Sequence, residues 1–170
     1  MRRVNVIVAL VAVLTAFAAP GVAQPDFSGE WTLTTATSNR VRGGGSGEQP
    51  VRDYVMEFHA FNCGRECRIV HKGSTLTVEN ARLSDGATAP SPSVAFVIDG
   101  QSHTVVDSVT PNRTIESVAR WQDGKLVITS MAGPMRMTQT VSLEQNQLVV
   151  VRSGLTDPDS KWTLRYTRKK

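Results

Sequence analysis

The chain of 170 residues is 40% hydrophobic and 20% charged, and its 19 Lys and Arg against 15 Asp and Glu give a formal net charge of +4 at pH 7. This length suffices for one domain with a substantial core and leaves no room for a second. Basic residues are interspersed with acids except at the terminal Arg168-Lys169-Lys170, so the sequence predicts no continuous basic track and no nucleic-acid binding.

Residues 1–23 have the organisation of a secretory signal peptide. Two arginines precede an apolar run over residues 4–19, and small residues follow as far as Ala23. The run is short for a membrane span of about 20 residues. We therefore expect cleavage after Ala23 and export to a secreted or periplasmic location. The mature domain, residues 24–170, then has no membrane span, and its net charge falls to +2 because cleavage removes two arginines and no acid.

Apolar residues beyond the signal peptide recur with period two, and no stretch has a helical stripe, so nearly all of the mature chain is predicted to be β-strand. The first strand covers residues 27–33 and has one apolar face. Further strands are expected at residues 52–61, 67–71, 75–83, 94–98, 102–106, 115–121, 126–131, 135–143, 148–152 and 161–167.

Short turns are expected between these strands, because Gly permits positive φ and Asp-Gly is a strong hairpin signal. They lie at Gly73-Ser74, Asp99-Gly100, Asp123-Gly124, Gly133-Pro134, Gln145-Asn146 and residues 157–160. The glycine-rich residues 43–47 are expected to form a flexible loop, since no Lys-Ser/Thr pair and no helix follow to complete a phosphate cradle.

About ten strands joined by short turns are typical of an antiparallel meander. The predicted fold class is all-β, as a single antiparallel up-and-down barrel of about 8–10 strands, because closure removes exposed strand edges. A two-sheet β-sandwich is the alternative, since alternation alone is common to both architectures.

The motif Asp26-Phe27-Ser28-Gly29-Glu30-Trp31 resembles the start of calycin-type barrels, the lipocalins and their small secreted bacterial relatives. The resemblance implies a lipocalin-like domain in which Gly29 and Trp31 close one end of the barrel and Arg168 covers Trp31 by a cation–π contact. It also implies binding of a small apolar molecule. Other lipocalin motifs and the helix before the last strand are missing, so we expect a reduced version of the fold.

The two cysteines, Cys63 and Cys67, are predicted to form a disulfide because exported chains enter an oxidising compartment. If residues 64–66 are a hairpin turn, then Cys63 faces Cys67 and Phe61 faces Ile69 across a two-stranded ribbon.

The same register places His59 opposite His71. Two facing imidazoles could supply two ligands to zinc, copper or haem iron, and His59 and His71 are therefore the candidate metal ligands. The alternative is a pair of partly exposed strand histidines without a ligand.

No nucleophile motif with a supporting base was found, so the chain is expected not to be an enzyme and to need no cofactor. The leading functional hypothesis is a secreted or periplasmic protein that binds a small apolar ligand. One alternative is an envelope interaction or structural protein with a filled core, and another is a metal or haem binder using His59 and His71. The sequence indicates no oligomeric state.

Overall fold

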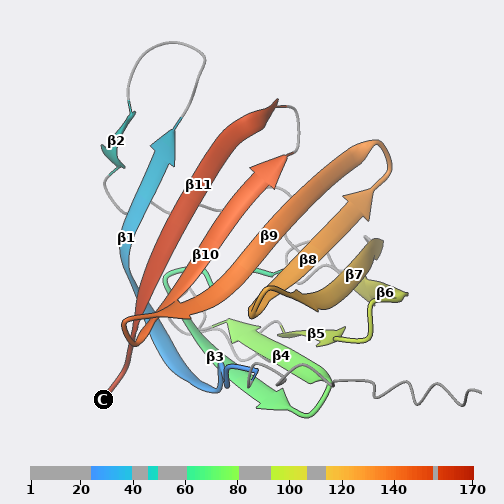
Figure 1. Ribbon diagram of the computed structural model, residues 1–170, viewed down its shortest axis with the longest axis horizontal. Helices are drawn as coiled ribbons and strands as arrows, with labels where there is room; N and C mark the ends of the chain where they lie inside the picture. Colours follow the sequence, from blue (N-terminus) through green and yellow to red (C-terminus); the bar gives the residue numbers. More distant parts are fainter. Residues whose placement is uncertain (1–23, 40–45, 50–60, 81–92, 107–113, 155–156) are drawn as a thin grey trace, which may run out of the picture.

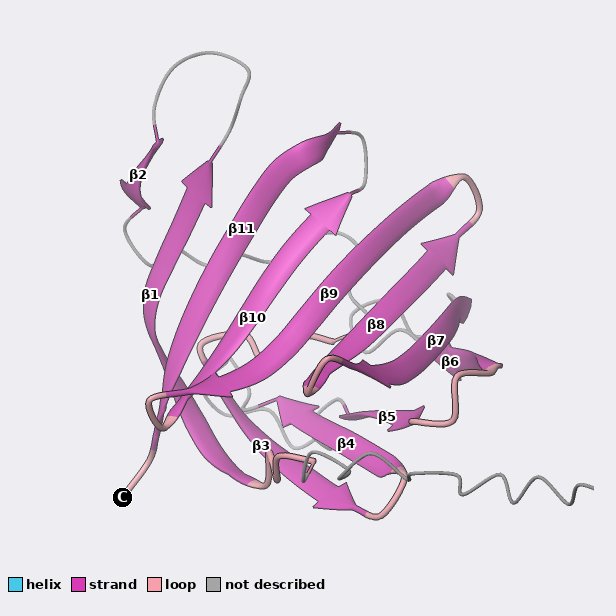
Figure 2. Ribbon diagram, viewed as in Figure 1, coloured by secondary structure: helices cyan, strands magenta, loops and turns pink. Residues whose placement is uncertain are grey.

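The computed structural model describes residues 24–39, 46–49, 61–80, 93–106, 114–154 and 157–170 (Figure 1). These residues form eleven strands: β1 (Gly29–Asn39), β2 (Ser46–Gln49), β3 (Glu66–Lys72), β4 (Thr75–Asn80), β5 (Ser93–Val97), β6 (Ser102–Val106), β7 (Thr114–Gln122), β8 (Lys125–Ala132), β9 (Met135–Glu144), β10 (Gln147–Gly154) and β11 (Asp157–Arg168). Figure 2 shows strands and connecting loops, and no helix, throughout the described ranges.

All eleven strands belong to one antiparallel sheet, in which ten strands follow the order β5-β4-β3-β1-β11-β10-β9-β8-β7-β6 and β2 adds to the side of β1. The sheet curls into a nearly closed up-and-down barrel (Figure 1). The predicted fold class is therefore confirmed, and the sandwich alternative is wrong because there is a single continuous sheet. None of the described ranges contains a helix with the length and hydropathy needed to span a bilayer.

The barrel closes between β5 and β6, the two ends of the sheet. Asp99-Gly100 was predicted to pair these two strands as a hairpin, and that prediction is wrong: β5 pairs with β4, and β6 pairs with β7. Across this seam the described residues form one parallel bridge, Ile98 with Ala119, and the Gly100 N–H donates to the Ala119 carbonyl at 3.0 Å. The turn therefore carries the chain from one end of the sheet to the other.

Most other turns fall where the sequence places them. Asp123 and Gly124 both have positive φ, 51° and 72°, and join β7 to β8, while Gln145 and Asn146 do the same between β9 and β10. This is the backbone of a two-residue hairpin whose twist matches that of the flanking strands. Gly73, at φ 56°, lies in the turn between β3 and β4.

Two loop predictions are wrong. Residues 157–160 were expected to be the last turn but belong to β11, where the register jumps from Ser153–Lys161 to Gly154–Asp157. This irregularity accommodates Pro158, which has no N–H to donate to the ladder. Residues 46–47, expected in the glycine-rich loop, are part of β2 on the side of β1. Residues 52–60 and 81–83, which belong to two of the predicted strands, lie outside the described residues.

The expected ribbon between the strand ending at Phe61 and the one containing Ile69 is also wrong. Ile69 pairs with Gly29 of β1 on one side and with Val78 of β4 on the other, so both edges of β3 are occupied at this position. Phe61 lies instead in an irregular segment before β3.

The core lies inside the barrel and draws on ten strands, β1 and β3 to β11, because alternate side chains of these strands turn inward. Its largest fully buried members are Trp31, Tyr166, Phe27, Phe61, Phe96, Ile69, Leu76, Ile115, Leu126, Ile128, Met137 and Leu148. The buried polar side chains are Ser38, Ser117, Ser130, Gln139, Ser142 and Arg152. Within this set Ser117, Ser130, Gln139 and Arg152 stand in phase with buried apolar residues of their strands, so the interior is not purely apolar.

Candidate functional site

Trp31 lies at the start of the barrel, 1% exposed, with its indole N–H donating to the Phe27 carbonyl at 2.9 Å. The Arg168 guanidinium lies 4.9 Å from the centre of the Trp31 ring, and the two residues are register partners on β1 and β11. Gly29 has φ 142°, and a Cβ at this position would lie 3.3 Å from Arg168 Nε. The three residues expected from the sequence to close this end are thus in mutual contact.

His71 lies beside the same end of the barrel, packed among aromatic rings. Its ring stacks on Phe27 at 5.9 Å and approaches Trp121 at 6.0 Å, while Nδ1 lies 3.8 Å from an Asp26 carboxylate oxygen. The predicted partner His59 lies outside the described residues. Among the residues that are described, no three His, Cys, Asp or Glu side chains gather in an arrangement that could hold a metal ion.

The expected disulfide between Cys63 and Cys67 is present, with the two Cα atoms 4.9 Å apart. Both cysteines are buried, at 0% and 3% exposure. The bond connects β3 to residues 61–64, which we call the internal segment. Within it the Gly64 N–H donates to the Asn62 side chain at 2.9 Å, and Gly64 has φ 55°.

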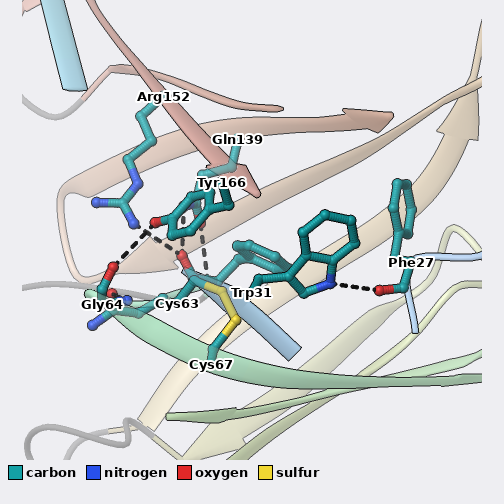
Figure 3. The surroundings of a disulfide bond; sticks show 10 residues. Phe27, Trp31, Cys63, Gly64, Cys67, Gln139, Arg152 and Tyr166 are labelled. Carbon is teal, nitrogen blue, oxygen red and sulfur yellow. Dashed lines mark hydrogen bonds between the residues drawn. A yellow bond between two sulfur atoms is a disulfide. The ribbon is translucent and has the colours of Figure 1, made fainter. Parts of the chain in front are cut away.

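Three polar side chains from adjacent strands converge on the internal segment (Figure 3). Gln139 of β9 uses its whole amide, accepting from the Phe61 N–H at 3.0 Å and donating to the Phe61 carbonyl at 2.7 Å. Arg152 of β10 donates to the same carbonyl at 3.4 Å, and the Tyr166 hydroxyl of β11 donates to the Gly64 carbonyl at 3.3 Å. Gln139 and Arg152 are direct register partners, so the ladder places them side by side.

Burial determines the electrostatics of this group. Removal from water raises the pKa of Tyr166 to about 12, although the nearby Arg152 charge opposes the shift. Burial also lowers the pKa of Arg152, because it disfavours the charged guanidinium. Tyr166 is therefore a neutral hydrogen-bond donor at neutral pH. Arg152 and Tyr166 can both donate to an acceptor atom held between β10 and β11.

A second buried polar contact continues around the wall. The hydroxyls of Ser117 on β7 and Ser130 on β8 lie 2.8 Å apart at 3% and 0% exposure. The interior thus carries polar groups on five consecutive strands, from β7 to β11, among mainly apolar neighbours.

Sequence reasoning missed Gln139 and Arg152. Gln139 stands on the apolar face of its strand, between Met137 and Val141, and Arg152 continues the inward alternation of Leu148 and Val150. A polar residue in phase with an apolar face is the signal that could have identified both.

No protein-family model matches the chain, and no curated protein sequence matches it. Solved structures do match. A Schistosoma mansoni fatty acid binding protein in complex with arachidonic acid is 16% identical with a TM-score of 0.56, covering 85% of this chain and 96% of that one. A mutant of the fluorescent protein UnaG is 17% identical with a TM-score of 0.55 and the same coverage. Human cRBP IV is 15% identical with a TM-score of 0.54, covering 85% of this chain and 99% of that one. These solved structures are fatty-acid-binding-protein-like calycin barrels, and the chain shares their fold.

Proposed function

We propose that this protein is a binding protein and not an enzyme, and that it binds a small apolar ligand inside its barrel. One end of the ligand accepts hydrogen bonds from Arg152 and Tyr166. The observation that carries the proposal is Arg152, a basic residue that is only 4% exposed and lies in the interior of the barrel. Burying a charged group is costly and is weak evidence for stability. A buried, shifted titratable group inside a concave fold is a marker of a functional site.

The interior side chains favour an apolar ligand. Phe96, Ile128 and Leu148 are buried on three different strands, so a ligand among them would meet aliphatic and aromatic groups. The donors of Arg152 and Tyr166 then suit a carboxylate or another anionic acceptor, since charge-assisted hydrogen bonds are the stronger kind. The similar Schistosoma protein is described as a fatty acid binding protein, which makes a long-chain fatty acid the first candidate.

The test is a calorimetric titration of residues 24–170 with arachidonic acid and with its methyl ester. We expect saturable binding with a preference for the acid. Arg152→Met should reduce that preference at least tenfold, which corresponds to about 1.4 kcal/mol. Arg120→Met is the matched control, because Arg120 is exposed on the outside of β7. Absence of saturable uptake by the native protein would refute the proposal and favour an interaction protein with a filled core.

We also propose that the chain is exported and works in a secreted or periplasmic location. The support is the signal-peptide organisation of residues 1–23 and the disulfide at Cys63 and Cys67, a bond that persists in oxidising compartments. Intact-mass measurement of the protein from its native host tests this proposal. A mass that includes residues 1–23 would contradict it.

A further inference from the structure

Residues 61–64, the internal segment, occupy the position in which a ligand would meet the polar side chains of the barrel. The segment precedes β3, which pairs with β1, yet its main chain is bonded to Gln139, Arg152 and Tyr166 on the strands β9, β10 and β11. It therefore extends from one wall to the wall that carries the proposed ligand contacts (Figure 3).

The bonds of the internal segment imitate those of a ligand. The Phe61 carbonyl accepts from both Gln139 and Arg152, and the Gly64 carbonyl accepts from Tyr166. The Phe61 ring is fully buried and lies 6.3 Å from the ring of Phe96, so it also fills apolar space. One polar end and one apolar body are the two parts that the proposed ligand would have.

The bonds from Arg152 and Tyr166 are the ones most open to competition. At 3.4 and 3.3 Å they are long for their type, and their acceptors are neutral carbonyls. An anionic ligand oxygen would form shorter and stronger bonds with the same donors. In contrast, the Cys63–Cys67 disulfide keeps the segment close to β3, so it can return whenever the ligand leaves.

We propose that residues 61–64 compete with the ligand for the same polar side chains while the Cys63–Cys67 disulfide holds them to β3. A ligand then binds only when the main chain of Phe61 is displaced from Gln139 and Arg152. This inference rests on the proposed function and adds a regulatory element to it. The apparent affinity is then the intrinsic affinity multiplied by the fraction of molecules in which the segment is displaced. Weakening the segment raises affinity without any new contact to the ligand.

The first test compares the binding of sodium oleate to three variants by isothermal calorimetry. Phe61→Ala and the double variant Cys63→Ser/Cys67→Ser should each bind at least tenfold more tightly than the wild type. Ile115→Ala is the matched control, because it opens space at a fully buried apolar side chain of β7, whereas the segment is bonded to β9, β10 and β11. An equal gain for Phe61→Ala and Ile115→Ala would show only the effect of added space and would overturn the inference.

The second test uses the unmodified protein and follows hydrogen exchange at the Phe61 amide by nuclear magnetic resonance. Saturation with oleate should speed this exchange at least tenfold, because the bond to Gln139 is broken. Saturable binding with undiminished protection at Phe61 would overturn the inference and leave the proposed function intact. Failure of the wild type to bind would instead refute the proposed function, whether or not Phe61→Ala binds.

Discussion

Replacing Gly29 with alanine tests how the closed end of the barrel is built. Gly29 has φ 142°, a backbone region in which a non-glycine residue costs about 1–3 kcal/mol. The new Cβ would also lie 3.3 Å from Arg168 Nε, so the guanidinium must shift away from Trp31. Loss of that cation–π contact adds about 0.5–1 kcal/mol. We expect Gly29→Ala to lower the free energy of unfolding by about 2–4 kcal/mol.

The two contributions can be separated by urea unfolding, followed by tryptophan fluorescence, in a double-mutant cycle with Arg168→Ala. In the Arg168→Ala background, Gly29→Ala should lower the free energy of unfolding only by the cost of the backbone conformation. The coupling free energy between the two substitutions should therefore be about 0.5–1 kcal/mol. Gly73→Ala is the control for positive φ in open space. Its Cβ would meet nothing within 4 Å, and we expect a cost of about 1 kcal/mol.

Two results would refute this reasoning. A Gly29→Ala variant no less stable than Gly73→Ala would show that the close approach to Arg168 adds no cost beyond that of positive φ. Strict additivity in the cycle would show that Arg168 does not contact Trp31 in solution in the way described.

Three further predictions concern the buried polar groups. Because the pKa of Tyr166 is raised to about 12, its contribution to stability is complete below about pH 10 and is lost as the pH rises toward 12. The loss in the free energy of unfolding should be about 1.4 kcal/mol per pH unit. Tyr166→Phe should abolish this loss when urea unfolding is measured between about pH 9 and 11.5. Ser130→Ala should lower the free energy of unfolding by about 1–3 kcal/mol, because the Ser117 hydroxyl loses its hydrogen-bond partner. Adding Ser117→Ala should lower it little further, and thermal unfolding of both variants measures the two effects. Trp31→Phe should cost about 1–3 kcal/mol, because the buried Phe27 carbonyl loses its donor, and urea unfolding monitored by circular dichroism measures it.

Each of these predictions has an outcome that contradicts it. Equal alkaline destabilisation of wild type and Tyr166→Phe would place the titrating group elsewhere. Additive costs for Ser117→Ala and Ser130→Ala would mean that the two hydroxyls do not bond to each other. An unchanged stability for Trp31→Phe would mean that water reaches the Phe27 carbonyl.

The strands and most hairpins were predictable from the sequence because their causes are local. Asp123-Gly124 takes the positive φ values that its turn requires, and strand alternation needs only one buried face. Asp99-Gly100 carries the same local signal, yet its flanking strands pair elsewhere, because closing a ten-strand sheet gives each of them another partner. Which strands pair depends on the whole barrel, so it cannot be predicted from a short stretch of the sequence.

The candidate site was less predictable for a related reason. A hairpin turn at residues 64–66 would have given a two-stranded ribbon, but β1 and β4 already occupy both edges of β3. The polar interior arises where Gln139 and Arg152 become neighbours across two strands and meet a segment about 80 residues earlier in the chain. Only the three-dimensional register brings those residues together.

The seam between β5 and β6 has a topological consequence. Those strands are neighbours in the chain but stand at the two ends of the sheet, while β1 and β11 lie side by side, with the Lys169 N–H bonded to the Glu30 carbonyl at 2.8 Å. A circular permutant that joins residue 170 to residue 24 and opens the chain between Gly100 and Gln101 would begin at β6 and end at β5. Apart from β2, its strands would then follow the sheet from one end to the other in chain order. Every ladder would be retained, and the covalent link across the seam would be lost.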